Sequence, residues 1–92
     1  MNSSIGQKLV VLGNEYDDKL RERLLEVLQE MGAKPTDHWK GVGGSQELER
    51  LEVNLEAKSV VVEAETYVGL TITGDAVLVD DVARRVRART AG

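Results

Sequence analysis

The chain has 92 residues, of which 41% are hydrophobic, and this length and composition suit one domain with one core. Its 16 acidic and 12 basic residues give a net charge of −4, whereas proteins that bind nucleic-acid phosphates are usually basic. Cysteine is absent, which excludes disulfides and thiolate metal sites. The first 13 residues contain no long apolar run. We therefore expect a cytoplasmic protein with neither a membrane span nor a nucleic-acid partner.

A strand and a helix are predicted at the start of the chain. Residues 8–12 (KLVVL) form a short apolar run closed by Gly13, and because both parities are apolar we expect a strand covered on both faces. Asn14 is the expected cap of the helix that follows. Gly32 and Pro35 end that helix. Its apolar stripe, at helical spacing, is Leu20, Leu24, Val27, Leu28 and Met31.

Residues 33–46 (AKPTDHWKGVGGSQ) are predicted to form a long loop, with a short strand around Trp39 as the alternative. Loops of this length are uncommon in compact domains and are often functional. We expect residues 1–6 to be frayed and residues 90–92 to form a tail.

Alternation of apolar and polar residues predicts a hairpin over residues 50–67. A two-residue turn at Lys58 and Ser59 places apolar partners on one face of this hairpin. The predicted pairs are Ala57–Val60, Leu55–Val62, Val53–Ala64 and Leu51–Thr66.

The second strand of the hairpin continues in phase to Ile72, which predicts one long strand over 60–73. A break near Thr66 and Tyr67, giving two strands, is the alternative. Asp75 then caps a second helix. The apolar stripe of this helix is Leu78, Val79, Val82, Ala83 and Val86.

The order β-α-β-β-α predicts an α+β two-layer sandwich, with a small, mostly antiparallel sheet and two helices on one face. The arrangement is like a split β-α-β unit that lacks its final strand. The first strand is expected at an edge, beside the strand over 60–73. Its outer side would be covered by residues 33–42 or by self-association with a second copy of the chain.

The polar face of the hairpin is acidic. Residues 47–74 hold six acidic residues against Arg50 and Lys58. The predicted register puts Glu52 opposite Glu65 and Arg50 opposite Tyr67, and like charges facing across a ladder are destabilising. The face is interpreted either as a solvated surface that resists aggregation or as a binding surface for a basic protein partner. The predicted partner-binding residues are Glu52, Glu63, Glu65, Tyr67 and Arg50.

A glycine-rich segment is a second candidate site. It resembles a backbone nest that could hold an anion, and the alternative is a flexible connector whose glycines permit positive φ. The candidate anion-binding residues are Lys40, Gly41, Gly43, Gly44 and Ser45.

Asp37, His38 and Trp39 place the only imidazole beside a carboxylate and the only indole. A general base needs a nucleophile or a substrate within reach, and a zinc site needs further His or Cys ligands. The sequence identifies neither, so no catalytic residue, metal or cofactor is predicted. We expect the indole to lie over the end of the core and the imidazole to lie at the surface.

Three classes of function are therefore kept. A noncatalytic protein-interaction domain is favoured by the small size, the acidity and the lack of a catalytic set. A small-ligand or anion-sensing regulatory module would use residues 40–46. A small enzyme would use Asp37, His38 or a glutamate carboxylate.

Overall fold

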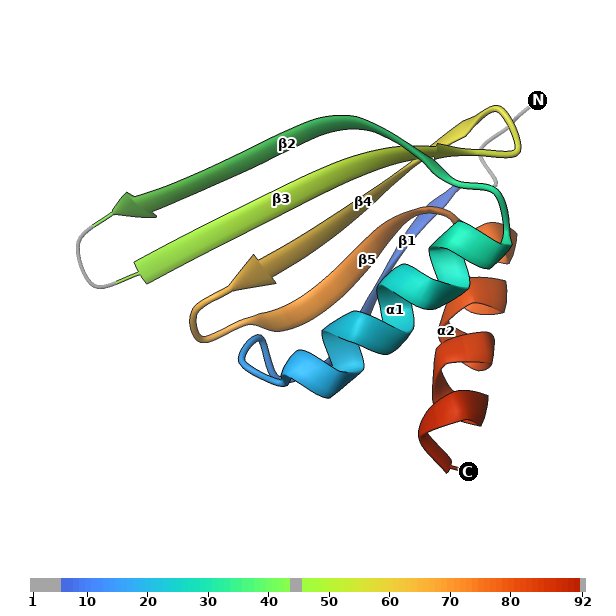
Figure 1. Cartoon of the computed structure of the whole chain (residues 1–92). Coiled ribbons are helices and arrows are strands. Elements are labelled where there is room, and N and C mark those ends of the chain that lie inside the picture. The colour runs from blue at the N-terminus through green and yellow to red at the C-terminus, as the bar shows by residue number, and fades with distance from the viewer. Residues whose placement is uncertain (1–5, 44–45, 92) are drawn as a thin grey trace.

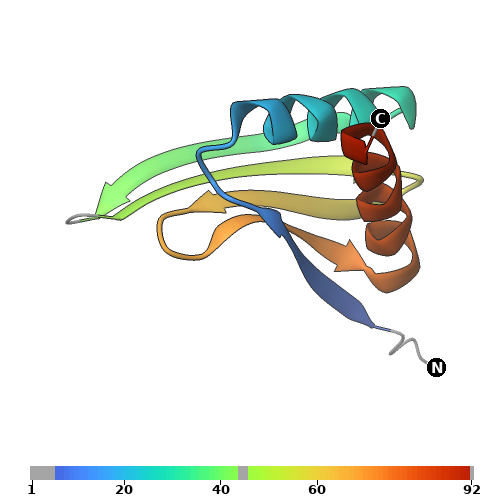
Figure 2. The same cartoon turned by 90° about the horizontal axis from the view of Figure 1, so that it is seen from below.

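The computed structural model describes residues 6–43 and 46–91. They form one five-stranded sheet, with strand order β1-β5-β4-β3-β2 and every neighbouring pair antiparallel. Both helices lie on the same side of this sheet (Figures 1 and 2). The elements are β1 (Gln7–Gly13), α1 (Asp18–Glu30), β2 (Lys34–Gly43), β3 (Gln46–Leu55), β4 (Lys58–Glu65), β5 (Gly69–Asp75) and α2 (Ala76–Ala91).

The predicted class is confirmed: the protein is an α+β domain with an antiparallel sheet and two helices on one face. The structure adds two strands to the predicted order. One is β2, in the segment 33–46 that was expected to be a loop, so the alternative of a strand around Trp39 is the correct one. The predicted tail at residues 90–92 is also shorter, because α2 continues to Ala91. Residues 1–5, predicted to be frayed, lie outside the described residues.

The other additional strand comes from a turn inside the predicted long strand over 60–73. Tyr67 and Gly69 have φ of +73° and +113°, values that let the chain reverse between β4 and β5. Val62 then pairs with Ile72, and both are even-numbered. The turn therefore keeps the alternation in phase, which explains why periodicity alone favoured one strand.

The β3–β4 hairpin turns two residues earlier than predicted. Glu56 and Ala57 have φ of 55° and 63°, the pair of left-handed residues typical of a two-residue hairpin turn. The resulting register pairs Val53 with Val60, so the predicted pairs are wrong. The face of each residue is nevertheless unchanged, because the shift preserves parity.

The local caps explain where the helices begin. Asp17, and not the predicted Asn14, caps α1 by accepting a hydrogen bond from the Leu20 N–H at 3.0 Å. The Asn14 Oδ1 accepts from the Tyr16 N–H at 2.7 Å and forms the turn before the helix. The Asp75 carboxylate accepts from the Leu78 N–H at 3.1 Å, as predicted for α2.

The core lies between the helices and the inner face of the sheet. Both predicted helical stripes are buried in it, except that Met31 is only partly buried. Within residues 6–43 and 46–91, no helix is long and apolar enough to cross a membrane. The sheet contributes Val53, Leu55, Val60, Val62, Leu70 and Ile72 to the core.

Strand β1 lies at an edge of the sheet, as predicted, and pairs with β5. Its Val10 and Leu12 pack partly against the core. The expectation that it is covered on both faces is wrong within the single chain, because Leu9 and Val11 are 53% and 49% exposed. Residues 33–42 do not cover it either, since β2 forms the opposite edge.

Candidate functional site

The face of the sheet away from the helices, here called the open face, carries rows of side chains that cross all five strands. Residues paired across a ladder share one face, so the register assigns each row directly. The first row is Trp39, Arg50, Glu63, Thr71 and Val11. The second row is Asp37, Glu52, Val61, Thr73 and Leu9.

Acidic side chains concentrate on the open face of β2, β3 and β4. Asp37 lies directly opposite Glu52 across the β2–β3 ladder, and Glu63 lies beside Arg50 across β3–β4. Glu65 follows on the same face of β4, and apolar side chains border the acids at both edges. On one edge is Trp39, 52% exposed, and on the other are the exposed Leu9 and Val11 of β1.

The structure therefore brings together four of the five predicted partner-binding residues: Glu52, Glu63, Glu65 and Arg50. The predicted facing pairs are corrected, because Glu52 opposes Val61 instead of Glu65, and Arg50 opposes Glu63 instead of Tyr67. Tyr67 lies apart, in the β4–β5 turn, where it is 78% exposed. The predicted like-charge pair Glu52–Glu65 is therefore wrong, and the register instead places Asp37 opposite Glu52 on this face.

The glycine-rich segment is largely strand in the described residues. Lys40 and Gly41 belong to β2 and pair with Glu49 and Leu48 of β3. The Trp39 ring lies over Gly41, where an added Cβ would meet the indole at 2.5 Å. Gly43 ends the strand, and Gly44 and Ser45 lie outside the described residues. The anion-binding hypothesis for residues 40–45 thus stays a prediction.

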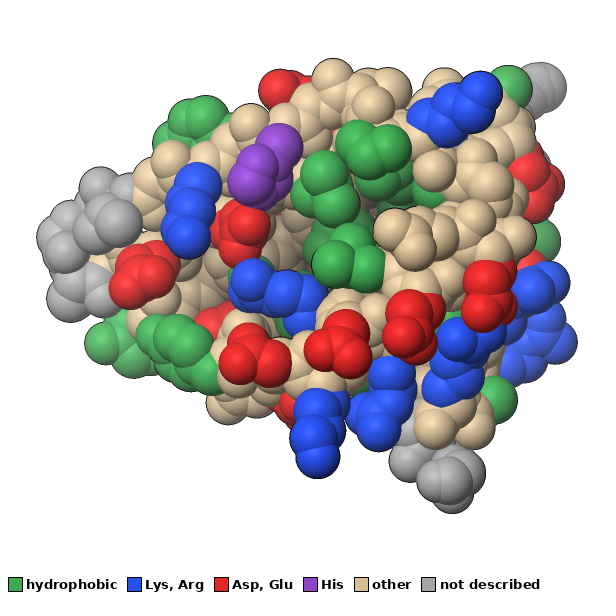
Figure 3. Space-filling view, viewed as in Figure 1, with side chains coloured by type: hydrophobic (Ala, Val, Ile, Leu, Met, Phe, Trp, Pro, Cys, Tyr) green, Lys and Arg blue, Asp and Glu red, His purple; other side chains and the backbone are tan. Residues whose placement is uncertain are grey.

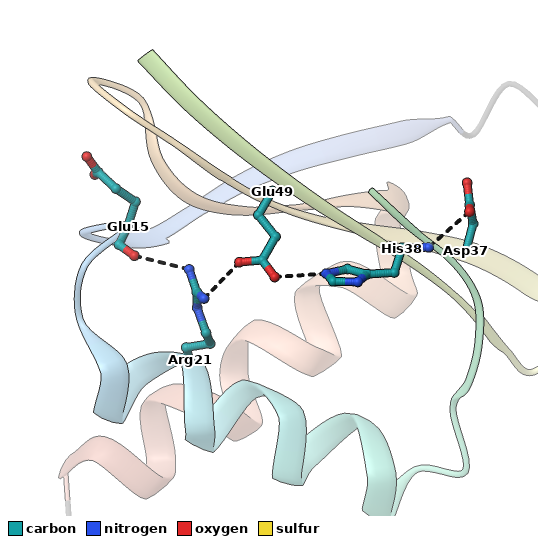
Figure 4. A network of polar contacts seen from close by, with 5 residues as sticks. All are labelled: Glu15, Arg21, Asp37, His38 and Glu49. Atoms are coloured by element: carbon teal, nitrogen blue, oxygen red, sulfur yellow. Dashed lines mark hydrogen bonds and ion pairs between the residues drawn. The ribbon is translucent and has the colours of Figure 1, made fainter. Parts of the chain in front are cut away.

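A polar cluster on the helix side of the sheet was not predicted. Arg21 of α1 donates through Nη1 to Glu49 Oε1 of β3 at 2.9 Å, and His38 Nε2 of β2 lies 2.8 Å from Glu49 Oε2 (Figure 4). Since a carboxylate only accepts, the imidazole donates in this contact. Arg21 also reaches the Glu15 carbonyl oxygen at 3.4 Å. The cluster ties α1 to the long β2–β3 ribbon.

The electrostatics of this cluster favour an ionised Glu49. The hydrogen bond from His38, with the nearby charges of Arg21 and Lys40, holds the pKa of Glu49 below its ordinary value of 4.5, against the opposing effect of burial. Its side chain is 28% exposed. The carboxylate is therefore a fixed acceptor in the cluster and a poor proton donor near neutral pH.

An apolar hollow of about 360 Å³ adjoins the cluster. It lies on the helix side, between Leu25 of α1 and the inner face of β3 and β4. Figure 3 shows hydrophobic side chains gathered beside the histidine. A second, more polar hollow of about 280 Å³ shares Arg21, Glu49 and Ala64 with it. The apolar hollow is lined by Arg21, Leu25, His38, Glu49, Leu51, Val62, Ala64 and Leu70.

Strand alternation explains why the cluster was missed. Asp37, His38 and Trp39 were considered together, but consecutive strand residues point to opposite faces. Asp37 and Trp39 lie on the open face, whereas His38 lies on the helix side. Glu49 is one of the six acidic residues in the range 47–74 that was predicted to be acidic on its polar face, but it shares the odd parity of Leu51 and lies on the helix side with His38. An acid in the apolar phase of a strand was the signal that could have identified the site.

Comparisons of the chain with protein-family models, curated proteins and solved structures found no match. Within the part of the chain that the structure describes, no group of three or more His, Asp or Glu side chains is arranged to hold a metal ion. The described hydrogen bonds give the His38 ring one side-chain partner, Glu49, which orients the imidazole but is not a nucleophile activated by it.

Proposed function

We propose that this protein is a noncatalytic protein-interaction domain that binds a basic partner segment on the open face of its sheet. The observation that carries the proposal is the placement of Asp37 directly opposite Glu52 on that face. Like charges in this arrangement cost about 0.2–1 kcal/mol of stability. A partner that brings Lys or Arg side chains between them would remove the repulsion.

The surroundings of the acids also suit an interface. Both helices pack on the other side of the sheet (Figure 2), so the described chain leaves the open face uncovered. Trp39 and Arg50 are adjacent across β2 and β3, and Trp and Arg are enriched among residues that dominate binding energies. Opposite charges on the partner would speed association and fix its orientation.

The chain provides its own probe for this proposal, because Trp39 is the only tryptophan and lies on the open face. A short peptide of alternating Lys and Val, without aromatic residues, is titrated while the Trp39 emission is followed. Saturable binding that weakens with added salt is expected. Glu52→Gln/Glu63→Gln should weaken the binding about two- to thirtyfold, since exposed ion pairs contribute about 0.2–1 kcal/mol each.

The matched control is Glu22→Gln/Glu26→Gln, which removes the same charge from exposed positions on α1. This control should bind the peptide as the wild type does. Equal weakening by the two double variants would show that only net charge matters, and the proposal would fail.

A small-ligand module is the second candidate, favoured by the hollow and not by the glycine-rich segment. Ligand sites are commonly apolar cavities of roughly 300–1,000 Å³ with a few polar groups, and this hollow has about 360 Å³ with His38 and Glu49 at its rim. Its test is the fluorescence of an anilinonaphthalene sulfonate dye with wild type and with Ala64→Leu. Loss of the dye signal on filling the hollow would favour this function.

A further inference from the structure

The free edge of β1 carries the further inference, which concerns assembly and does not depend on the proposed function. β1 pairs with β5 on one side, and no described strand pairs with its other side. Such an edge presents unpaired N–H and C=O groups, a template for another strand. Natural edge strands are usually protected by an outward lysine or by a cover.

The protection is weak here. Lys8, the charged residue of β1, is held by Asp80 of α2 at 2.9 Å, so its charge is directed toward the protein's own helix. Leu9 and Val11 leave about half of their side chains exposed on the open face. An edge of this kind, apolar and unguarded, favours pairing with another chain.

A second copy of the chain fits this edge by symmetry. Antiparallel pairing of β1 with itself about a two-fold axis at Val10 pairs the central residues Leu9, Val10 and Val11, which precede the irregularity between Val11 and Gly13. In this register Leu9 lies beside the partner's Val11 on the open face, and Val10 lies beside the partner's Val10 on the helix side. Each exposed apolar side chain of β1 then gains an apolar neighbour.

The same symmetry would also bring the two α2 helices together. α2 packs on β1 and β5, so a two-fold axis at the β1 edge places the two α2 helices antiparallel and next to one another. The acidic Asp80 and Asp81 lie early in this helix, and its arginines lie later. Antiparallel neighbours bring the acidic start of one helix toward the basic end of the other. Within one chain Asp80 already pairs with Lys8, and Asp81 pairs with Arg84 and Arg85, so contacts between the two helices would exchange these ion pairs. The arginines are Arg84, Arg85, Arg87 and Arg89.

We propose that the chain forms a homodimer in which the β1 strands pair antiparallel and join the two five-stranded sheets into one continuous sheet. The open faces of the two copies then become one surface with two acidic centres. The pairing removes the free β1 edge of both copies.

Sedimentation equilibrium over a wide concentration range tests the dimer. The wild type should show twice the chain mass of 10.1 kDa. Leu9→Lys and Val11→Lys change exposed side chains, so each variant should stay folded by circular dichroism while its dimer dissociation constant rises about tenfold or more. The control Trp39→Lys, an equally exposed residue near the opposite edge, should dimerise like the wild type. A monomeric wild type, or unchanged dimerisation of both β1 variants, would overturn the proposal.

Single cysteines test the register, because the chain has none of its own. The Cα atoms of facing residues in antiparallel strands lie about 4.5–5.5 Å apart. A disulfide can join residues at this Cα–Cα distance. A mixture of Leu9→Cys and Val11→Cys chains should cross-link in higher yield than either variant alone. Equal or lower yield from the mixture would contradict the two-fold axis at Val10.

Discussion

Asp37 and Glu52 face each other across the β2–β3 ladder, two carboxylates in directly opposed positions on an exposed sheet. Each has a local hydrogen bond: the Asp37 Oδ1 accepts from the His38 N–H at 3.0 Å, and the Glu52 Oε2 accepts from the Ser59 hydroxyl. These bonds orient the two carboxylates. The proposed binding of a basic partner would relieve this repulsion between the two carboxylates.

Glu52→Gln should stabilise the isolated protein by about 0.2–1 kcal/mol, because it removes the repulsion from Asp37 and keeps an oxygen for Ser59. Urea unfolding, read as a rise in midpoint at unchanged slope, measures the effect. The control Glu22→Gln, on the exposed side of α1, should change the free energy of unfolding by less than about 0.5 kcal/mol. A destabilised Glu52→Gln would mean that this carboxylate is not under repulsion.

The Glu49 cluster predicts a specific loss of stability in acid. The pKa of Glu49 is lowered in the folded protein, so its contribution is fully present above the unfolded value of about 4.5. It is lost as the pH falls from there through the lower, folded pKa. Glu49→Gln should cost about 0.5–1 kcal/mol at pH 7, and less at pH 3.

Urea unfolding of both proteins at a series of pH values measures this difference. The gap in unfolding free energy between wild type and Glu49→Gln should narrow as the pH falls below 4.5. A gap that is independent of pH down to 3 would contradict the lowered pKa.

Two glycines with left-handed backbones should differ in their tolerance of a side chain. Gly69 has φ of +113°, and an added Cβ would meet the Gly13 carbonyl oxygen at 2.5 Å. Gly32 has φ of +87° and no atom within 4 Å of that position. Gly69→Ala should cost clearly more than the roughly 1 kcal/mol expected for backbone strain alone at Gly32→Ala. Thermal unfolding of the two glycine variants measures the difference. Equal losses of stability in Gly69→Ala and Gly32→Ala would refute the close contact between β1 and the β4–β5 turn.

Adjacent leucines of α1 test the position of the core. Leu24 is fully buried, whereas Leu25 is 38% exposed at the apolar hollow. Leu24→Ala should destabilise the protein by about 2–5 kcal/mol, because it opens a cavity. Leu25→Ala, the matched control, should lower the free energy of unfolding markedly less. Urea unfolding measures both variants. Similar losses for both variants would show that α1 is rotated relative to this structure.

Period-two alternation predicted the faces of the sheet better than its connections. Val53 and Val60 lie in the core as expected, although their predicted partners were wrong, because moving a turn by two residues does not change parity. The turn at Glu56 and Ala57 requires positive φ at both residues, and neither residue type signals this. The pairing of residues between β3 and β4 therefore could not be predicted from the sequence.

Strand β2 could not be predicted from the sequence, for a different reason. Pro35, Asp37 and two glycines disfavour strands, and its side chains are mostly exposed, so no buried apolar face marks it. Its pairing with β3 supplies the strand that the local sequence does not favour. The acids of the open face were predictable from β3 and β4 alone, whereas the Asp37–Glu52 pair and the Arg21–Glu49–His38 cluster depend on β2.

The central claim, that a basic segment binds the open face, is tested most directly by methyl NMR during titration with the Lys-Val peptide. Val61 and Val62 are consecutive in β4 but point to opposite faces, toward the acids and toward the hollow respectively. The methyl signals of Val61 should shift while those of Val62 and Leu51 stay in place. Shifts of Val62 and Leu51 with a static Val61 would place the peptide in the hollow and contradict the claim.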